Sequence, residues 1–231
     1  MYMPMTTIMR AGAQPAKPRT SGPLGPHPSA GALKRRFFIA VMPPEKITAP
    51  LDDLRQQGPA HWDWKRHKDL HISLAFPGPL NQTQLKKLIN VLSKVEHKAF
   101  PLNFSGLDCF MRDPFNRKQA SSLHVLWARP ETRADAHLRS LHAEIIDHLK
   151  RHKFAAGRRD IVPHLTVAKV PAHDHNLVSH FAAAHAHKPT PSFQCDRFGI
   201  YETLEKNDPR HPDHNNGQGS RYVKVAEFIL K

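Results

Sequence analysis

The sequence is poor in cysteine and has no long apolar run, and each deficit narrows the class of protein. Its 231 residues include only 2 cysteines, Cys109 and Cys195, which are too few for the disulfide framework of a small secreted domain. No apolar run approaches the roughly 18 residues or more of a membrane-spanning helix. We therefore expect a cytoplasmic protein without a membrane partner.

Acidic residues are also scarce. The chain has 20 Asp and Glu against 34 Lys and Arg, a formal net charge of +14 at pH 7. Such an excess favours a polyanionic partner: a nucleic acid, a phosphorylated ligand or an anionic surface. The 18 histidines are the unusual feature of the composition and require a separate explanation.

Residues 1–33 differ in composition from the rest of the chain. They are rich in Pro, Gly, Ala and Ser, lack any periodicity, and contain no acidic residue. This composition predicts a disordered N-terminal tail. Arg10, Lys17 and Arg19 give it a faint similarity to an organelle transit peptide, although a dispensable tail or a misplaced start codon is the simpler explanation. Residues 34–231 are predicted to form the folded domain.

From residue 34 onward, strand-like and helix-like runs follow one another. The predicted strands are 35–42, 70–76 (ended by Pro77-Gly78), 100–110, 122–129, 163–170, 192–204 and 221–230, and the predicted helices are 45–57, 81–95, 131–151 and 175–187. This succession predicts an α+β fold.

The succession contains an internal repeat. The separation from His71 to Gly106 equals that from His164 to Gly199, 35 residues in each case. An Asp-Pro turn follows each glycine-containing run, at 113–114 and at 208–209. These coincidences predict two similar lobes, each of which contributes one histidine-bearing strand.

The two histidine strands carry matched motifs, His71-x-Ser73 and His164-x-Thr166. Side chains alternate along a strand, so each histidine shares a face with its hydroxyl residue. If the strands face each other, one neutral imidazole can take a proton from an attacking water while the other protonates the departing sugar oxygen. The hydroxyls can hold the phosphoryl oxygens, and such a site needs no metal.

A single motif of this kind means little in a chain with 18 histidines, since most would be ordinary core or surface residues. Two copies in matched strands, 93 residues apart, favour a function in phosphodiester cleavage.

Five segments together resemble a known family. They are RRFFIAVMPPE, KDLHISLAFPG with the preceding Trp64, IVPHLTVAK, FGIYETL and GSRYVKVAEFIL. The second is similar to the family pattern W-x(5)-L-H-x-T-L-x-F-x-G and the third to P-H-[IL]-T-x-A-[RK]. From about Arg35 to its end, the chain resembles the two-histidine (2H) phosphoesterases, and among them the RNA 2′,3′-cyclic phosphodiesterases, also called 2′-5′ RNA ligases.

The resemblance implies a fold and a set of roles. The fold would be two pseudo-symmetric lobes, each an antiparallel sheet with helices, around a central cleft. His71 and His164 would be the catalytic pair, with Ser73 and Thr166 holding the cyclic phosphate. Lys169 stands where many members have arginine, so a cation is kept without the bidentate fork, and we expect weaker or differently oriented phosphate binding.

The implied reaction opens the cyclic phosphate at an RNA end to a 2′-phosphate, without metal or nucleotide cofactor. Reverse 2′-5′ ligation is implied only as a minor activity. The partner would be RNA or an oligonucleotide with a cyclic phosphate end, and we expect a monomer with no obligate protein partner. Which histidine is the base and which the acid is left open by the sequence.

Three alternatives remain. The first is a 2H phosphodiesterase acting on a small cyclic nucleotide or an ADP-ribose cyclic phosphate. The second is a non-catalytic RNA-binding module of the same fold, although pure binding has no need for two opposed acid–base groups. The third is RNA ligation as the main role; the sequence lacks a G-x(4)-G-K-[ST] loop, which disfavours only an ATP-dependent enzyme.

Other residues suggest further interpretations. The histidine pairs 67/71, 173/175, 185/187 and 211/214 have spacings that zinc ligands use, but without nearby cysteines we expect solvated side chains and no metal. The basic residues Lys65, Arg66, Lys68 and Arg158-Arg159 are either plain surface or a footprint for an RNA backbone. For Trp62, Trp64 and Phe110, core packing is a simpler role than base stacking.

Overall fold

The computed structural model describes residues 34–112, 123–157, 160–214 and 219–231. The N-terminal tail, the Asp113-Pro114 turn and Arg158-Arg159 therefore lie outside the described residues. The strands are β1 (Arg35–Val41), β2 (Asp63–Trp64), β3 (Ile72–Leu80), β4 (Phe100–Leu102), β5 (Phe104–Phe110), β6 (Leu123–Pro130), β7 (Leu165–Pro171), β8 (Phe193–Cys195), β9 (Arg197–Thr203) and β10 (Tyr222–Ile229). The helices are α1 (Glu45–Gln57), α2 (Gln82–Leu92), α3 (Thr132–Arg151) and α4 (His175–Ala184), with short 3₁₀ turns η1 (His67–Asp69), η2 (Ala172–Asp174) and η3 (Pro212–His214).

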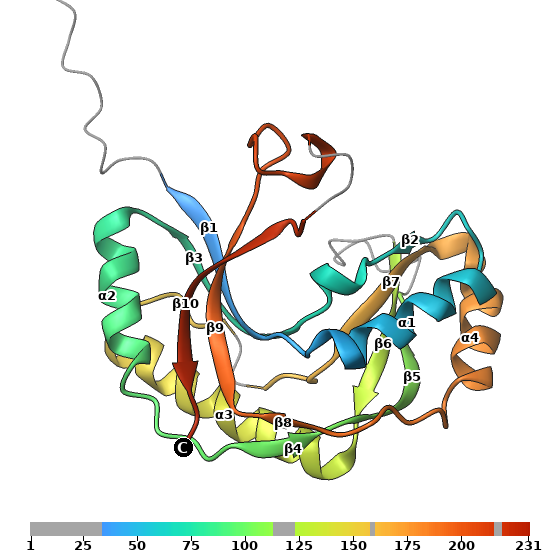
Figure 1. Ribbon diagram of the computed structural model, residues 1–231, viewed down its shortest axis with the longest axis horizontal. Coiled ribbons are helices and arrows are strands. Elements are labelled where there is room, and N and C mark those ends of the chain that lie inside the picture. The colour runs from blue at the N-terminus through green and yellow to red at the C-terminus, as the bar shows by residue number, and fades with distance from the viewer. Residues whose placement is uncertain (1–33, 113–122, 158–159, 215–218) are drawn as a thin grey trace, which may run out of the picture. The chain divides into compact units, whose positions relative to one another are not determined.

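The strands form one 8-stranded sheet in the order β10-β9-β1-β3-β7-β6-β5, with β2 beside β7, and a small sheet of β4 and β8. Every pairing among the described strands is antiparallel. Figure 1 shows β1, β3, β9 and β10 grouped together and β5, β6 and β7 grouped apart from them. The prediction of an α+β fold with antiparallel sheets is confirmed.

The two groups of strands meet at one residue pair. Among the described residues, β3 and β7 are paired only through Ile72 and Leu165, both fully buried. The sequence repeat is visible in the sheet, because β3 and β7 are central neighbours while Gly199 lies in β9 and Gly106 in β5. The halves of the chain nevertheless interleave: the C-terminal β9 and β10 pair with β1, whereas β5 and β6 pair with β7.

The helices cover the sheet through their apolar stripes. α3 packs against β3 and α2, and α4 packs against β5 and β6. Asn81 caps α2 through a reciprocal capping box with Gln84, as its position before an apolar stripe predicts. Within the described residues, no helix is long and apolar enough to cross a membrane.

Two strand predictions need correction. Pro77-Gly78 does not end the second strand, because β3 continues to Leu80. Phe37 pairs with Gly78 and Ile39 with Ala75, so an extra residue is accommodated there as a bulge, and Gly78 adopts φ +85°. The run 100–110 is two strands, since β4 pairs with β8 in the small sheet while β5 pairs with β6 in the large one.

Gly106 occupies a position that only glycine fits. Its φ is +146°, and a Cβ there would lie 2.2 Å from the carbonyl oxygen of Ala186. The backbones touch at this point because the amide of Leu107 donates to the carbonyl of His185 (3.0 Å). The turn after α4 is therefore held directly against β5.

Substituting Gly106 should destabilise the protein strongly. Gly106→Ala combines backbone strain with a backbone clash, so we expect the free energy of unfolding in urea to fall by at least about 3 kcal/mol. Gly219→Ala is the matched control: its φ is +83°, but no atom of the described residues lies within 4 Å of the new Cβ. Strain alone should cost about 1 kcal/mol there. Equal losses in the two variants would contradict the close approach.

Candidate active site

The four residues of the paired motifs lie around the pair that joins β3 to β7. Ile72 is opposite Leu165, so the antiparallel register, extended by one residue on each side, places His71 beside Thr166 and Ser73 beside His164. Ile72 and Leu165 are buried, whereas the other four side chains are partly exposed. The two histidines and two hydroxyls therefore share one face of the sheet, as the alternation in each motif predicts.

A bulge brings Lys169 onto the same face. Thr166 pairs with Trp127 and Ala168 with the adjacent Leu126, so Val167 is an extra residue. Val167 and Ala168 are both buried and Lys169 is exposed, which shows that the alternation resumes one position late.

β3 has the same bulge at the matching position. Ser73 pairs with Ala40 and Ala75 with the adjacent Ile39, which makes Leu74 the extra residue. Phe76 is thereby the counterpart of Lys169, and its side chain is 61% exposed. Phe76 lies on the face that carries His71, since the rings of both neighbour Phe38, at centroid distances of 6.5 and 4.8 Å.

Each histidine is anchored by its own chain. The Nδ1 of His71 lies 2.8 Å from the carbonyl oxygen of Asp69, and the Nδ1 of His164 lies 2.8 Å from that of Val162. A carbonyl only accepts, so Nδ1 carries the proton and donates in both residues. Nε2 is then the nitrogen available for proton exchange in both imidazoles.

Aromatic rings hold the two imidazoles in place. His71 contacts Phe38 and the edge of Tyr222, at centroid distances of 4.8 and 4.9 Å. His164 meets Phe110 edge-on at 5.1 Å, and Phe110 stacks on Trp127 at 4.6 Å. Phe110 therefore lies beside a motif histidine and not only in the core.

Burial lowers the pKa of both histidines. For His71, desolvation is the largest cause of the lowered pKa, opposed by its bond to the Asp69 carbonyl and assisted by the positive charges of His164 and Arg221. For His164, desolvation again lowers the pKa against the bond to the Val162 carbonyl. The charge of a protonated His164 is one of the smaller causes that lower the pKa of His71.

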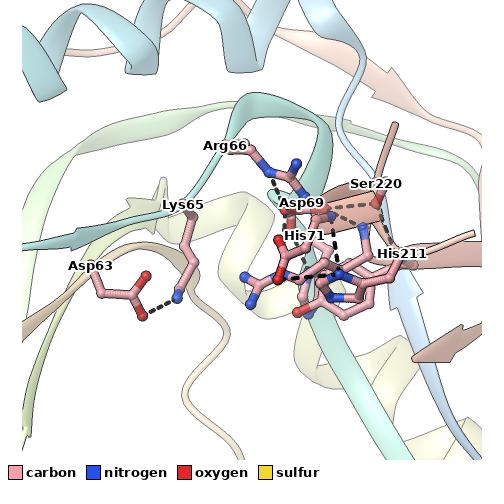
Figure 2. A network of polar contacts seen from close by, with 10 residues as sticks. Asp63, Lys65, Arg66, Asp69, His71, His211 and Ser220 are labelled. Carbon is pink, nitrogen blue, oxygen red and sulfur yellow. Dashed lines mark hydrogen bonds and ion pairs between the residues drawn. The ribbon is translucent and has the colours of Figure 1, made fainter. Parts of the chain in front are cut away.

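Asp69 ties the segment before His71 to the segment before β10 (Figure 2). Its buried carboxylate accepts from Arg66 Nη2 (2.7 Å) and Nε (2.9 Å), from Ser220 Oγ (2.7 Å) and from the Arg221 amide (2.9 Å). Burial alone would raise the pKa of this carboxyl, but these hydrogen bonds and the Arg66 charge hold it below its usual range. The Asp69 carboxylate is thus a fixed anion. The backbone carbonyl of the same residue accepts the hydrogen bond that anchors His71.

Three cations gather beside the motif strands: Lys65, Lys169 and Arg221. The Lys65 side chain is only 11% exposed and donates to Asp63 at 2.5 Å. Burial lowers its pKa despite this bond, and the charges of Arg221 and Lys169 lower it further. Sequence reasoning identified Lys65 and Lys169 but missed Arg221, because nothing in the sequence places residue 221 beside residue 69.

Two cavities share Tyr222 as a lining residue, and the ring of Tyr222 lies 4.9 Å from that of His71. One, of about 400 Å³, is lined among others by Met42, Leu70 and Lys224. The other, of about 600 Å³, is lined among others by Arg66 and Arg221. Both are open and partly polar, and neither is lined by a residue of the two motifs.

Several sequence interpretations are settled by burial. Trp62 and Trp64 are core residues, 3% and 8% exposed, and base stacking by them is wrong. Arg66 is committed to Asp69. Among the histidine pairs, His67 binds Asp52 (2.7 Å), His71 binds the backbone carbonyl of Asp69, and His185 binds the Phe181 carbonyl (2.9 Å). The expectation of solvated side chains is wrong for His185 and His211, which are 6% and 3% exposed.

Comparison with known proteins shows which protein family the chain matches. Residues 43–207 match the family model of the 2′-5′ RNA ligase superfamily. The chain therefore belongs to the 2′-5′ RNA ligase superfamily, the 2H phosphoesterases, as its motifs predict.

Individual relatives agree with this assignment. A Bacillus subtilis (strain 168) protein named RNA 2′,3′-cyclic phosphodiesterase is 23% identical over 185 residues, which cover 78% of this chain and 94% of that protein. The structure of E. coli LigT complexed with 3′-AMP matches 86% of this chain and 99% of LigT, with 18% identity and a TM-score of 0.60. The protein TT0787 of Thermus thermophilus matches 84% of this chain and 97% of its own, with 20% identity and a TM-score of 0.55.

The lowered pKa values of the two histidines can be measured directly. In an NMR titration of the imidazole Cε1–H resonances, both His71 and His164 should titrate below the ordinary value of about 6.5. His164→Ala should raise the pKa of His71, because it removes a neighbouring positive charge. A His71 pKa above about 6.5 in the free protein would contradict the dominance of burial.

Proposed function

We propose that the protein hydrolyses 2′,3′-cyclic phosphodiester ends of RNA to 2′-phosphomonoester ends, with His71 and His164 as the acid–base pair. The observation that carries the proposal is the β3–β7 register, which sets two Nδ1-anchored imidazoles and two hydroxyls on one face. The name of the Bacillus subtilis relative and the 3′-AMP bound by E. coli LigT support a nucleotide phosphodiester as the substrate.

The reaction needs a base that takes a proton from the attacking water and an acid that gives a proton to the leaving oxygen. The Nε2 of a neutral imidazole accepts a proton from water as the water oxygen attacks phosphorus. The Nε2 of the other, protonated imidazole donates to O3′ as the P–O3′ bond breaks. The 2′-oxygen stays on phosphorus, and the histidine pair ends with its protonation states exchanged.

The phosphoryl oxygens are bound by hydroxyls and cations. Ser73 and Thr166 donate to the nonbridging oxygens from between the imidazoles, and Lys169 balances the charge that develops there. Lys65 and Arg221 add a fixed positive field beside them. In this proposal the substrate lies between the two groups of strands on either side of the β3–β7 pair.

The nucleotide itself is bound by aromatic and basic surface. Phe76 exposes 61% of its surface on the face of His71 and offers a platform for an unpaired base. The net charge of +14 favours an RNA strand over a small cyclic nucleotide, which carries fewer phosphates. Intact acid–base geometry argues against a module that only binds RNA.

A cyclic-phosphate cleavage assay tests the reaction and both histidines. Full-length protein should convert an oligoribonucleotide ending in a 2′,3′-cyclic phosphate to the 2′-phosphate in the presence of EDTA, as identified by mass spectrometry and phosphatase sensitivity. His71→Ala and His164→Ala should each lower the rate by about 10²- to 10⁴-fold or more. His180→Ala, an exposed histidine on α4, is the control and should retain the full rate.

Three results would overturn the proposal: no turnover, turnover lost on chelation, or a near wild-type rate in either motif variant. A series of substrates separates RNA from smaller ligands. Nucleoside 2′,3′-cyclic phosphates and ADP-ribose cyclic phosphate should be cleaved with lower kcat/KM than an oligonucleotide, and the reverse order would favour the small-substrate alternative.

Lys169 should contribute to the reaction mainly by binding the phosphoryl oxygens of the substrate. Lys169→Ala removes a charge-assisted contact worth about 1.5–3 kcal/mol, so kcat/KM should fall by about 10- to 100-fold. Lys169→Arg keeps the cation and supplies a bidentate fork, so its kcat/KM should be at least that of the wild type. An unchanged kcat/KM in Lys169→Ala would remove this residue from the site.

A further inference from the structure

We propose that His61, His173 and Asp174 form a binding site for a divalent transition-metal ion, and that zinc is the ion their donor set suits. One ligand atom from each residue can be chosen so that all three lie within 4.8 Å of one another. Two imidazoles and a carboxylate are the ligands of three-residue zinc sites, which leave a fourth position to water or to another ligand.

The distances are close to those that a tetrahedral ion requires. His61 Nε2 lies 2.5 Å from Asp174 Oδ2, and His173 Nε2 lies 3.8 Å from Oδ1 of the same carboxylate. Ligand atoms about 2.1 Å from a tetrahedral zinc are about 3.4 Å apart. Side-chain rotations that change the separations of the three ligand atoms, which lie within 4.8 Å of one another, by up to about 1.4 Å would form such a coordination shell.

The carboxylate is oriented before any ion arrives. Trp62 Nε1 donates to Asp174 Oδ2 at 2.8 Å, and the Trp62 ring is 3% exposed between Trp64 and Phe181. An outer hydrogen bond of this kind fixes the direction of a metal ligand.

The two histidines remain accessible to an incoming ion. The His61 and His173 side chains are 55% and 78% exposed, so neither is committed to the core. Their rings stack nearly parallel, 11° apart at a centroid distance of 6.5 Å, and both Nε2 atoms approach the same carboxylate.

The sheet brings the two parts of the cluster together. β2 pairs with β7, Asp63 opposite Lys169 and Trp64 opposite Ala168, which sets the residues before β2 beside η2. His61 and Asp174 are 113 residues apart in sequence, so spacing alone cannot join them. The sequence pair His173 and His175 is not the site, because the His175 ring lies against His124 at 5.4 Å.

The cluster is separate from the motif histidines. His164 precedes β7 and Asp174 follows it, so a strand about 20 Å long lies between them. An ion here would take no part in the proposed acid–base chemistry. It would cross-link the residues before β2, the strand that leads to Lys65, to the beginning of α4.

Metal titration of matched variants tests the site. Zinc chloride titrated by calorimetry into tag-free, chelator-treated full-length protein should show one tight site per chain, above a weak background from the other histidines. His61→Ala, His173→Ala and Asp174→Asn should each weaken this site by at least about 10-fold. His180→Ala and His187→Ala, at exposed histidines outside the cluster, should leave it unchanged.

Two further readouts locate the ion and its effect. Cobalt should quench part of the tryptophan fluorescence in the wild type but not in His61→Ala, because Trp62 touches the ligand carboxylate. Zinc should raise the Tm of the wild type and not that of His61→Ala. His61→Ala and His173→Ala alter exposed side chains, so their folding, checked by circular dichroism, should be unaffected.

Absence of a tight zinc site, or equal affinity in the wild type and His61→Ala, would overturn the inference. Its failure is distinct from failure of the proposed hydrolysis, since Asp174→Asn should bind zinc more weakly yet cleave cyclic phosphate ends at the wild-type rate.

Discussion

The buried carboxylate of Asp69 is the constraint on which the first motif histidine, His71, depends. A buried carboxylate is costly unless its hydrogen bonds are satisfied, and here Arg66, Ser220 and the Arg221 amide supply them. These bonds join the segment before β3 to the segment before β10, which come from opposite ends of the described chain. The same residue offers its backbone carbonyl to His71, so the fold of the sheet edge and the orientation of an imidazole are fixed together.

The imidazole of His164 is also fixed by a hydrogen bond to a nearby backbone carbonyl, but no buried carboxylate takes part. His164 donates to the carbonyl of Val162, two residues earlier, just as His71 donates to the carbonyl of Asp69. Since each anchor is local, it sets the tautomer of each ring but not the distance between the rings. That distance depends on the Ile72–Leu165 pair, through which β3 and β7 are joined.

The sequence predicts those features that depend on local periodicity. The alternation in His71-x-Ser73 and in His164-x-Thr166 needs only a strand, and the cap at Asn81 needs only a helix. The sequence does not predict which face carries Phe76 and Lys169. In each strand a bulge shifts the alternation of side chains, and the bulge depends on pairing with the partner strand. Interleaving of β9 and β10 with β1, and the approach of His61 to Asp174, are likewise set by pairing between distant segments.

Electrostatics connects this geometry to the substrate. Burial leaves both imidazoles with lowered pKa values, and the charge of Arg221 opposes protonation of His71. Acid–base catalysis needs one of the two to be protonated. An anionic phosphate between them favours the protonated form, and by linkage protonation favours phosphate binding to the same extent. Arg221, whose charge opposes protonation of His71, would also attract a phosphodiester anion, so in the proposed reaction substrate binding and protonation of the pair would favour each other.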